Sequence, residues 1–258
     1  MTRLSPRRPR TGPRAPAGVR ALGLGVALVV VATGCFGPTR EPPVPIPPGI
    51  PPGAGAPVPT VDIDAPGRTS DQLRPWAEGI AEPMRIPVPA LAAYGNAAET
   101  MRQTRPECNL AWTTLAGIGR VESRHGNFRG SRLEDDGVAR PAIIGPRLDG
   151  SPGYAEIRDT DAGELDGDTE YDRAIGPLQF IPETWRKYGR DASGDGHADP
   201  NQIDDAAVAA ARLLCDRGGD LSRAENWQRA VLAYNASREY VMDVRDAAAA
   251  YSVGTTAP

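Results

Sequence analysis

The sequence is short of cysteine, of lysine and of long apolar runs, and these shortages exclude several classes of protein. Its 258 residues include three cysteines, too few for a dense disulfide scaffold. The apolar stretch from Ala21 to Ala32 has about a dozen residues, fewer than a bilayer span needs, and a polytopic membrane protein is excluded. The composition, with 29 glycines and 27 prolines, fits neither collagen nor a coiled coil. Lysine occurs once, as Lys187, and we assign no function to that bias.

Acidic side chains dominate the body of the chain. The formal net charge is −4, but six arginines and no acidic residue precede Gly34. The rest of the chain therefore sets 23 basic side chains against 33 acidic ones. Since neutralising phosphates requires clustered lysine and arginine, we expect no nucleic-acid partner.

The N-terminal 35 residues have the pattern of an export signal. An arginine-rich start is followed by the apolar stretch and then by small residues, so residues 1–35 are predicted to be a signal peptide. An uncleaved membrane anchor is the alternative. Ala32-Thr33-Gly34-Cys35 resembles the lipobox of bacterial lipoproteins, although alanine stands where leucine is usual. The resemblance implies that Cys35 is lipidated and that the protein is exported to the cell envelope, membrane-anchored and facing the cell wall. Ordinary signal cleavage would also export it.

Residues 36–84 are predicted to be a disordered, proline-rich linker. The run from Pro38 to Pro59 lacks backbone donors and favours an extended spacer of about 3.1 Å per residue. A ligand for a proline-binding module is the competing interpretation. The folded domain is expected at residues 85–251, long enough for one core, with a flexible tail at residues 252–258.

Helical signals dominate the predicted domain, and strand-like alternation is scarce, so the fold class is mainly α. Proline in a first turn predicts helices opening near Pro89 and Pro182. Residues 108–124 have an apolar face, and an alanine-rich helix starts at Asp205. The remaining start signals are a capping-box pattern, Ser222 with Glu225, and a capping serine, Ser237.

Two cysteines remain once Cys35 is assigned to lipidation. Disulfides persist outside the cytoplasm, so Cys108 and Cys215 are expected to form a bridge. Two buried free thiols are the alternative.

Glu122 is the best candidate for chemistry. On a helix, Leu115, Ile118 and Glu122 are spaced by three and four and share one face. A carboxylate that continues an apolar stripe is partly desolvated, which raises its pKa and keeps it protonated as a general acid requires. Considered alone, a glutamate at a helix end is also a common surface residue.

Two further motifs, which follow Glu122 in the chain, favour a catalytic role for it over a surface position. Gly176-Pro177-Leu178-Gln179-Phe180 follows about fifty residues later, and Ala233-Tyr234-Asn235 lies near the end. Glu-Ser followed by these two motifs resembles the lytic murein transglycosylases. The stretch from Ala174 to Trp185, with the acidic loop after it, resembles their B-type branch. The resemblance covers most of residues 85–250.

The resemblance implies a lysozyme-like helical fold that cleaves the MurNAc–GlcNAc β-1,4 bond of peptidoglycan and leaves 1,6-anhydroMurNAc ends, without a cofactor for the chemistry. Glu122 would be the single catalytic acid and base, whereas most glycosidases use two carboxylates. Ser123 would help to position the N-acetyl group. Gln179 and Phe180 would line the sugar groove, Tyr234 would hydrogen-bond near Glu122, and Asn235 would shape the floor. Phe180 and Tyr234 as plain core aromatics, and Ser123 as a helix-end hydroxyl, are the alternatives. His125 is expected at the surface.

A second constellation predicts a structural Ca²⁺ site. Asp191, Ser193 and Asp195 stand at positions 1, 3 and 5 of an EF-hand-like loop, with Gly196 at position 6 and the carbonyl of His197 at position 7. Position 12 is Gln202, so the ordinary loop fails there. B-type transglycosylases have a similar loop with a later closing acid, which by resemblance is Asp205, with Asp204 second. A turn without metal is the alternative.

Residues 131–172 depart from the simplest family pattern. This acidic segment is interpreted as a groove wall, a second cation site or a solvated insertion, and the sequence does not decide among them. A hydrolytic muramidase on the same fold and a non-catalytic peptidoglycan-binding lipoprotein are the competing functions. No second acid has a defensible position as water activator, which favours transglycosylation over hydrolysis.

Overall fold

A computed structural model describes residues 47–258. The predicted signal peptide, Cys35 and the first part of the predicted linker lie outside the described residues. The described part is mainly helical, as predicted. Its helices are η1 (Thr69–Leu73), α1 (Arg74–Met84), α2 (Val88–Thr104), η2 (Pro106–Cys108), α3 (Trp112–Ser123), α4 (Pro182–Tyr188), α5 (Ile203–Gly218), α6 (Ala224–Tyr234) and α7 (Arg238–Ser252). Its strands are β1 (Arg132–Leu133), β2 (Ala139–Arg140), β3 (Ile144–Arg147) and β4 (Arg173–Ile175), paired antiparallel as β1–β2 and β3–β4.

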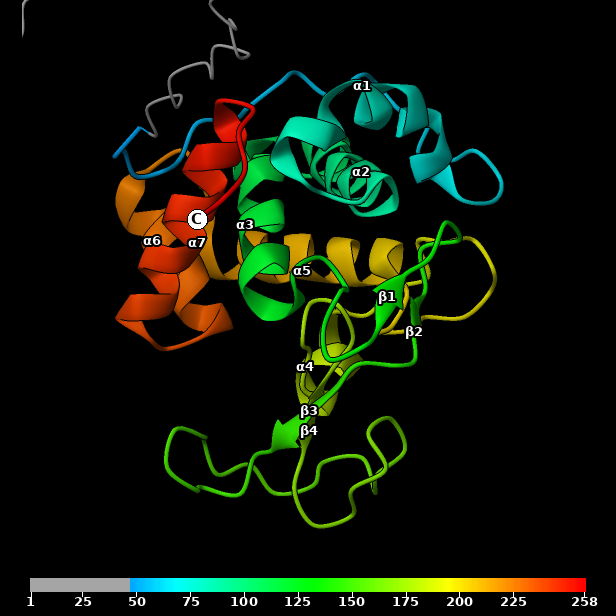
Figure 1. The fold of residues 1–258 in the computed structure, drawn as a ribbon, viewed down its shortest axis with the longest axis vertical. Helices are drawn as coiled ribbons and strands as arrows, with labels where there is room; N and C mark the ends of the chain where they lie inside the picture. The colour runs from blue at the N-terminus through cyan, green and yellow to red at the C-terminus, as the bar shows by residue number, and fades with distance from the viewer. Residues whose placement is uncertain (1–46) are drawn as a thin grey trace, which may run out of the picture. The chain divides into compact units, whose positions relative to one another are not determined.

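The helices pack around α5, which crosses the middle of the body below α2 and α3 (Figure 1). Helix α3 packs mainly on α7, α2 on α5, and α5 on α6. Fully buried side chains from these helices form one core, among them Tyr94, Leu115, Trp227 and Val244. Burial of this apolar surface stabilises the arrangement and places the end of α3 beside the start of α7.

The folded part begins earlier than Arg85. In α1, Ala77, Ala81 and Met84 are spaced by four and three and turn one buried face toward the core. Ahead of them, Val61 is also buried. Arg68 Nε donates to Asp204 Oδ2 at 2.7 Å, which ties this segment to α5. Residues 69–84 are therefore helical and packed, not linker.

The C-terminal residues also pack on the body. Ala257 is buried in the core, and Arg120 Nη2 donates to the carbonyl of Pro258 at 2.7 Å. The prediction of a flexible tail at residues 252–258 is therefore wrong, because these residues contact the helical body.

Several local signals are confirmed. Cys108 and Cys215 form a disulfide with a Cα–Cα distance of 5.4 Å, joining η2 to the last turn of α5. Prolines occupy the first turns of α2 and α4, and Ser237 Oγ accepts from Tyr240 N at the start of α7. The capping box is wrong: α6 starts after Arg223, and Ser222 Oγ donates to Asp220 instead. Helix α5 starts at Ile203, two residues before the expected start at Asp205, with Gln202 as its N-cap.

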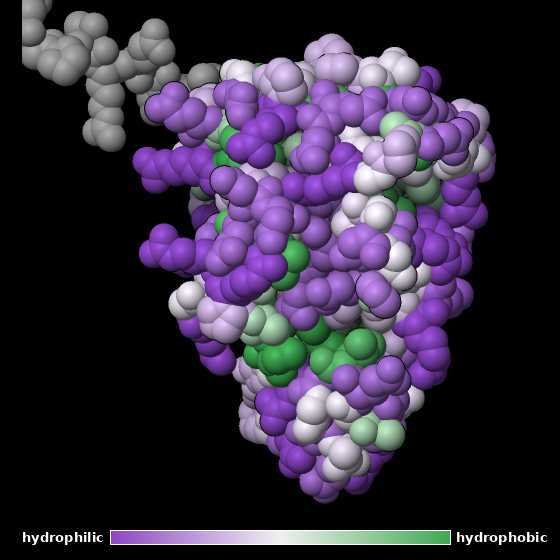
Figure 2. Space-filling model, turned by 90° about the vertical axis from the view of Figure 1, so that its right-hand side faces the viewer, coloured by the Kyte–Doolittle hydropathy of each residue, from purple (hydrophilic) through white to green (hydrophobic). Residues whose placement is uncertain are grey.

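The 131–172 segment projects from the helices and is anchored by the β3–β4 pair (Figure 1). Arg147 Nε and Arg173 Nε both donate to Asp168 Oδ2, at 2.7 and 3.0 Å. These charge-assisted bonds hold the two sides of the segment together. The face of the molecule in Figure 2 is mostly hydrophilic, with hydrophobic side chains gathered in its lower half. Within residues 47–258, no helix has the length and apolar character that a membrane span requires.

Candidate active site

Glu122 lies in the last turn of α3, where the helix meets a cavity. Leu115 and Ile118 on the same face are fully buried, and Glu122 is half-buried, as the spacing predicted. The helix ends at Arg124, whose left-handed backbone turns the chain away. The carboxylate therefore stands where the core opens toward solvent.

Burial and one hydrogen bond set the protonation of Glu122. Desolvation raises its pKa to about 7, and the hydrogen bond from Tyr240 opposes this rise. Tyr240 Oη donates to Glu122 Oε1 at 2.5 Å from the first turn of α7. Tyr240 carries no motif in the sequence that marks it as a site residue. The one signal that pointed to its position was Ser237, whose cap starts the helix that carries it.

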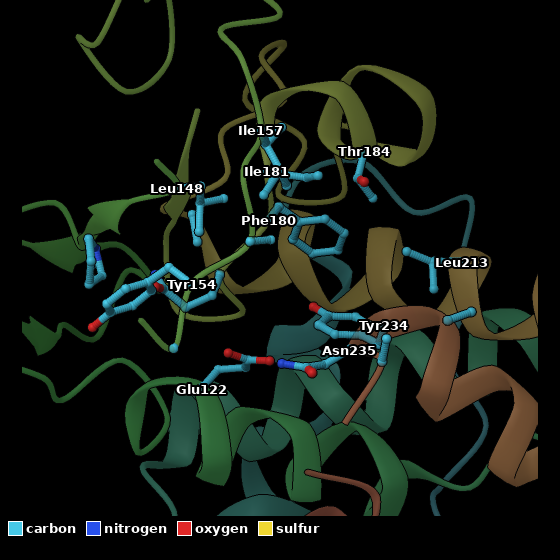
Figure 3. A pocket seen from close by; sticks show the side chains of 17 residues that line it. Glu122, Leu148, Tyr154, Ile157, Phe180, Ile181, Thr184, Leu213, Tyr234 and Asn235 are labelled. Atoms are coloured by element: carbon cyan, nitrogen blue, oxygen red, sulfur yellow. The ribbon is translucent and has the colours of Figure 1, made fainter. Parts of the chain in front are cut away.

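The cavity beside Glu122 has a volume of about 570 Å³. Its walls come from α3, the 131–172 segment, β4, the Gly176–Pro182 turn with α4, Leu213 of α5, and the end of α6 (Figure 3). Glu122 is the one acidic residue among its lining residues. The lining is otherwise largely aromatic, aliphatic and amide, and includes Leu148, Tyr154, Ile157, Gln179, Phe180, Ile181, Thr184, Tyr234 and Asn235.

The predicted Gln179 and Phe180 both line this cavity. A tight turn presents them: the backbone groups of Ile175 and Phe180 bond to each other at 2.8 and 2.9 Å. Gln179 has a left-handed backbone, φ 50°, and its Nε2 donates to the carbonyl of Gly176 at 2.9 Å. Phe180 is buried and packs edge-on against Trp185 and Tyr234. Phe180 is therefore part of the hydrophobic core and also part of the cavity wall.

Gly176 is required by the turn for both space and conformation. Its φ is +75°, and an added Cβ would lie 1.8 Å from the carbonyl oxygen of Pro200. We expect Gly176→Ala to lower the free energy of unfolding by about 3 kcal/mol, from a left-handed alanine and an overpacked contact. Gly167→Ala is the matched control, since φ there is +78° and nothing lies within 4 Å of the added Cβ. Denaturant unfolding of both variants measures the difference, and equal losses would contradict the steric account.

Tyr234 and Asn235 line the cavity, but the hydroxyl of Tyr234 does not bond to Glu122. It donates to the carbonyl of Leu178 at 2.7 Å, which fastens α6 to the Gly176–Pro182 turn. The ring stacks parallel to that of Tyr240, with centroids 6.4 Å apart. Asn235 is exposed, and its side chain faces Glu122 across the floor (Figure 3). The role expected of Tyr234, a hydrogen bond near Glu122, is thus filled by Tyr240.

The side chain of Ser123 is buried and points into the protein interior. Its hydroxyl donates to the carbonyl of Pro177 and accepts from the amide of Gly126 at 2.7 Å. With both bonds made to backbone, this hydroxyl positions the Gly176–Pro182 turn against α3. This is the helix-end hydroxyl that the sequence left as the alternative, and a role of Ser123 in positioning an N-acetyl group stays a prediction.

His125 is also buried, contrary to the surface position expected. Its ring lies between two tyrosines: Nδ1 is 3.2 Å from Tyr94 Oη, and Nε2 is 2.9 Å from Tyr251 Oη. Burial lowers its pKa to about 3, so the imidazole is neutral at neutral pH. The network joins α2, the end of α3 and α7 directly behind Glu122.

The 131–172 segment is a groove wall. Leu148, Tyr154 and Ile157 line the cavity opposite α6 (Figure 3). Of the three interpretations that the sequence left open, the structure supports this one directly. The wall adds an exposed tyrosine and two aliphatic side chains to a cavity that holds one acid.

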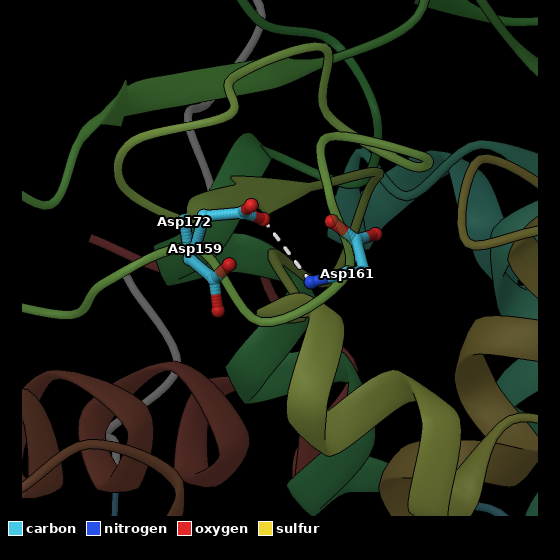
Figure 4. Close-up of side chains that lie close together, drawn as sticks. All are labelled: Asp159, Asp161 and Asp172. Atoms are coloured by element: carbon cyan, nitrogen blue, oxygen red, sulfur yellow. Dashed lines mark hydrogen bonds between the residues drawn. The ribbon is translucent and has the colours of Figure 1, made fainter.

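The same segment brings Asp159, Asp161 and Asp172 together, with ligand atoms within 4.8 Å of one another (Figure 4). Asp161 N donates to Asp159 Oδ1 at 3.1 Å. Asp172 accepts from the amide and hydroxyl of Thr160, so its oxygens are already bonded. Within residues 47–258, this is the one group of three or more such side chains that approach so closely.

The loop predicted to bind Ca²⁺ is closed by hydrogen bonds of its own. Asp191 accepts from the amides of Gly194 and Gly196, at 2.7 and 2.8 Å. Asp205 Oδ1 accepts from the amides of Ala192 and Ser193, each at 2.8 Å.

Asp205 thus bonds to the start of the loop, whereas Asp204 pairs with Arg68. Asp195 and His197 are exposed on the loop. Its oxygens are of the type that Ca²⁺ prefers, so the donor chemistry fits, and the ligand set Asp191, Ser193, Asp195, His197 and Asp205 stays a prediction.

A family model described as a transglycosylase SLT domain matches residues 157–247. The match includes Gln179, Phe180, Tyr234 and Asn235, and Glu122 lies before it. Two solved structures resemble the chain: the Escherichia coli lytic transglycosylase Slt35 in complex with bulgecin A and the same protein in complex with calcium. Each is 16% identical and covers 74% of this chain and 81% of its own, with TM-scores of 0.42 and 0.43. The comparison with curated proteins gave no match.

Proposed function

We propose that the protein is a peptidoglycan lytic transglycosylase of the B type, with Glu122 as its single catalytic acid and base. The observation that carries this proposal is a half-buried carboxylate with a pKa of about 7 at the wall of an otherwise acid-free cavity. A group with such a pKa can both donate and accept a proton near neutrality. The match of residues 157–247 to a transglycosylase domain supports the same reaction class.

The proposed reaction uses one proton twice. Protonated Glu122 donates to the oxygen of the MurNAc–GlcNAc bond, which breaks and leaves positive charge at the MurNAc C1. The N-acetyl group of MurNAc stabilises that charge. The Glu122 carboxylate then takes the proton from the C6 hydroxyl, whose oxygen bonds to C1. A 1,6-anhydroMurNAc end forms, no water is consumed, and Glu122 is protonated again without a cofactor.

Mass spectrometry of digested peptidoglycan tests this reaction. We expect MurNAc ends that lack the mass of one water, as the anhydro form requires. Reducing MurNAc ends would identify a hydrolytic muramidase instead. Binding to the wall without cleavage would identify a non-catalytic peptidoglycan-binding protein, against which the perturbed acid in the cavity argues.

Tyr240→Phe is expected to move the upper pH limit of activity. The hydrogen bond from Tyr240 lowers the pKa of Glu122, so its loss leaves the effect of burial unopposed and raises that pKa above about 7. The general acid then stays protonated to higher pH, and the basic limb of kcat/KM shifts upward.

Tyr171→Phe is the matched control for this experiment. It removes a hydroxyl outside the cavity, so the profile should not change. A Tyr240→Phe profile that superimposes on the wild type would contradict the assigned hydrogen bond.

Export, lipidation at Cys35, membrane anchoring and a structural Ca²⁺ remain part of the proposal. Together they would hold the enzyme at the envelope, next to glycan strands, with the Asp191–Asp205 loop tied down beside the groove. The bonds that Asp191 and Asp205 already make to loop amides support a structural role for that loop.

A further inference from the structure

A second cavity, of about 770 Å³, lies beside Glu122 and shares no other lining residue with the first. It is formed by the end of α3, the turn that follows and one side of α7. Its chemistry is different: besides apolar residues such as Val121 and Phe128, its lining has three arginines, Arg120, Arg124 and Arg129, and two aspartates, Asp243 and Asp246. Glu122 therefore separates two surfaces suited to different parts of one ligand.

Two of the arginines are available to a ligand. Among the described residues, Arg124 and Arg129 have no carboxylate within 4.0 Å, whereas Arg120 donates to the carbonyl of Pro258. Both available side chains are exposed, and the Arg129 guanidinium lies 5.1 Å from the centre of the Phe128 ring. This contact favours a guanidinium that lies along the cavity wall.

The local backbone holds these arginines in an unusual conformation. Arg124 has φ 54° and Arg129 has φ 49°, in the left-handed region that favours glycine. Arg124 stands at the left-handed end of α3, two residues after Glu122, and Arg129 lies in the turn that follows.

Asp243 and Asp246 limit which charged ligands the second cavity can bind. Asp246 is paired with Arg245 at 2.6 Å, whereas Asp243 is exposed and has no basic partner within 4.0 Å among the described residues. A cavity that offers guanidinium groups and a carboxylate favours a ligand with both negative and positive charges. A polyanion such as a phosphodiester polymer would meet repulsion at Asp243. A peptide that has free carboxylates and a free amine matches both signs.

We propose that this second cavity binds the stem peptide of the muramic acid next to the cleaved bond, with Arg124 and Arg129 holding its carboxylates. The inference rests on the proposed function, which supplies a glycan strand whose muramic acids bear such peptides. Guanidinium groups bind carboxylates in pairs of parallel hydrogen bonds, and Asp243 faces the amine. The apolar cavity on the other side of Glu122 takes the sugar rings.

Arg124→Gln with Arg129→Gln tests the proposal on two substrates, intact strands and strands stripped of peptides by an amidase. On intact strands we expect kcat/KM to fall by about tenfold, as the loss of charge-assisted bonds predicts. On stripped strands the fall should be several times smaller. Arg217→Gln with Arg223→Gln, two exposed arginines outside both cavities, is the matched control and should leave both substrates unaffected.

A binding measurement keeps this proposal separate from the proposed function. Titration of the isolated stem pentapeptide should give saturable binding to the wild type and weaker binding to the double variant. Absence of binding, or an equal loss of activity on both substrates, would overturn the peptide site even if the enzyme is active. Binding without any cleavage would leave the site in place and refute the transglycosylase reaction.

Discussion

Glu122→Gln is expected to lower cleavage of peptidoglycan by about 10²- to 10⁴-fold, the usual contribution of a general acid and base. The amide keeps the size of the side chain and an oxygen that can accept from Tyr240, so the fold should persist. The wild type should lose activity as the pH rises through about 7, because the form that donates is the protonated one. Product release from purified sacculi measures both effects.

The same substitution has a consequence for stability with a defined sign. The pKa of Glu122 is about 7 in the folded chain and 4.5 in its ordinary state, so ionisation weakens the fold as the pH rises between these values. Glu122→Gln should therefore be more stable than the wild type at pH 8 and equally stable at pH 4. Glu164→Gln, an exposed glutamate in the 131–172 segment, is the control. Full activity of Glu122→Gln would remove Glu122 from the mechanism.

Removal of the disulfide is expected to have the largest effect on stability. Cys108 and Cys215 are 107 residues apart, and the chain-entropy relation for a loop of that length gives about 4 to 5 kcal/mol. Cys108→Ser with Cys215→Ser should lower the free energy of unfolding by that amount in denaturant titrations.

A reductant supplies the control for the disulfide. It should destabilise the wild type by a similar amount and leave the double variant unchanged. A wild type that unfolds at the same denaturant concentration with and without reductant would show that the bridge contributes little to stability.

Local sequence patterns predicted the features that depend on neighbouring residues. The spacing of Leu115, Ile118 and Glu122 located the acid on the apolar face of its helix, and prolines in first turns located α2 and α4. Counting cysteines outside the lipobox identified the disulfide. In each case the physical rule acts over one or two helical turns, or pairs chemically unique residues.

Features set by distant contacts were not predicted. His125 was expected at the surface, but its partner Tyr251 lies 126 residues away, and the bond of Ser123 to Pro177 spans 54 residues. Nothing in the local pattern distinguishes a hydroxyl or imidazole that faces solvent from one that faces another helix. The hydrogen bond of Tyr240 to Glu122, across 118 residues, was missed for the same reason.

The predicted start of the domain, Arg85, is too late because the high proline content of the preceding residues indicates a linker. Prolines recur after the proline-rich run, at Pro66 and Pro75, and a short helix that contains prolines has a weak periodic signal. The burial of Ala77 and Ala81 depends on α2, against which α1 packs. Such a boundary becomes visible only when the partner helix is in place.

Glu122 and the cavity wall opposite it are held in place by different parts of the chain. Glu122 is held by α3 and α7 within the helical core, whereas Leu148, Tyr154 and Ile157 belong to a projecting segment clamped by its own arginine–aspartate pairs. Substitutions in the projecting segment can therefore change the shape of the cavity while the proton affinity of Glu122 stays the same.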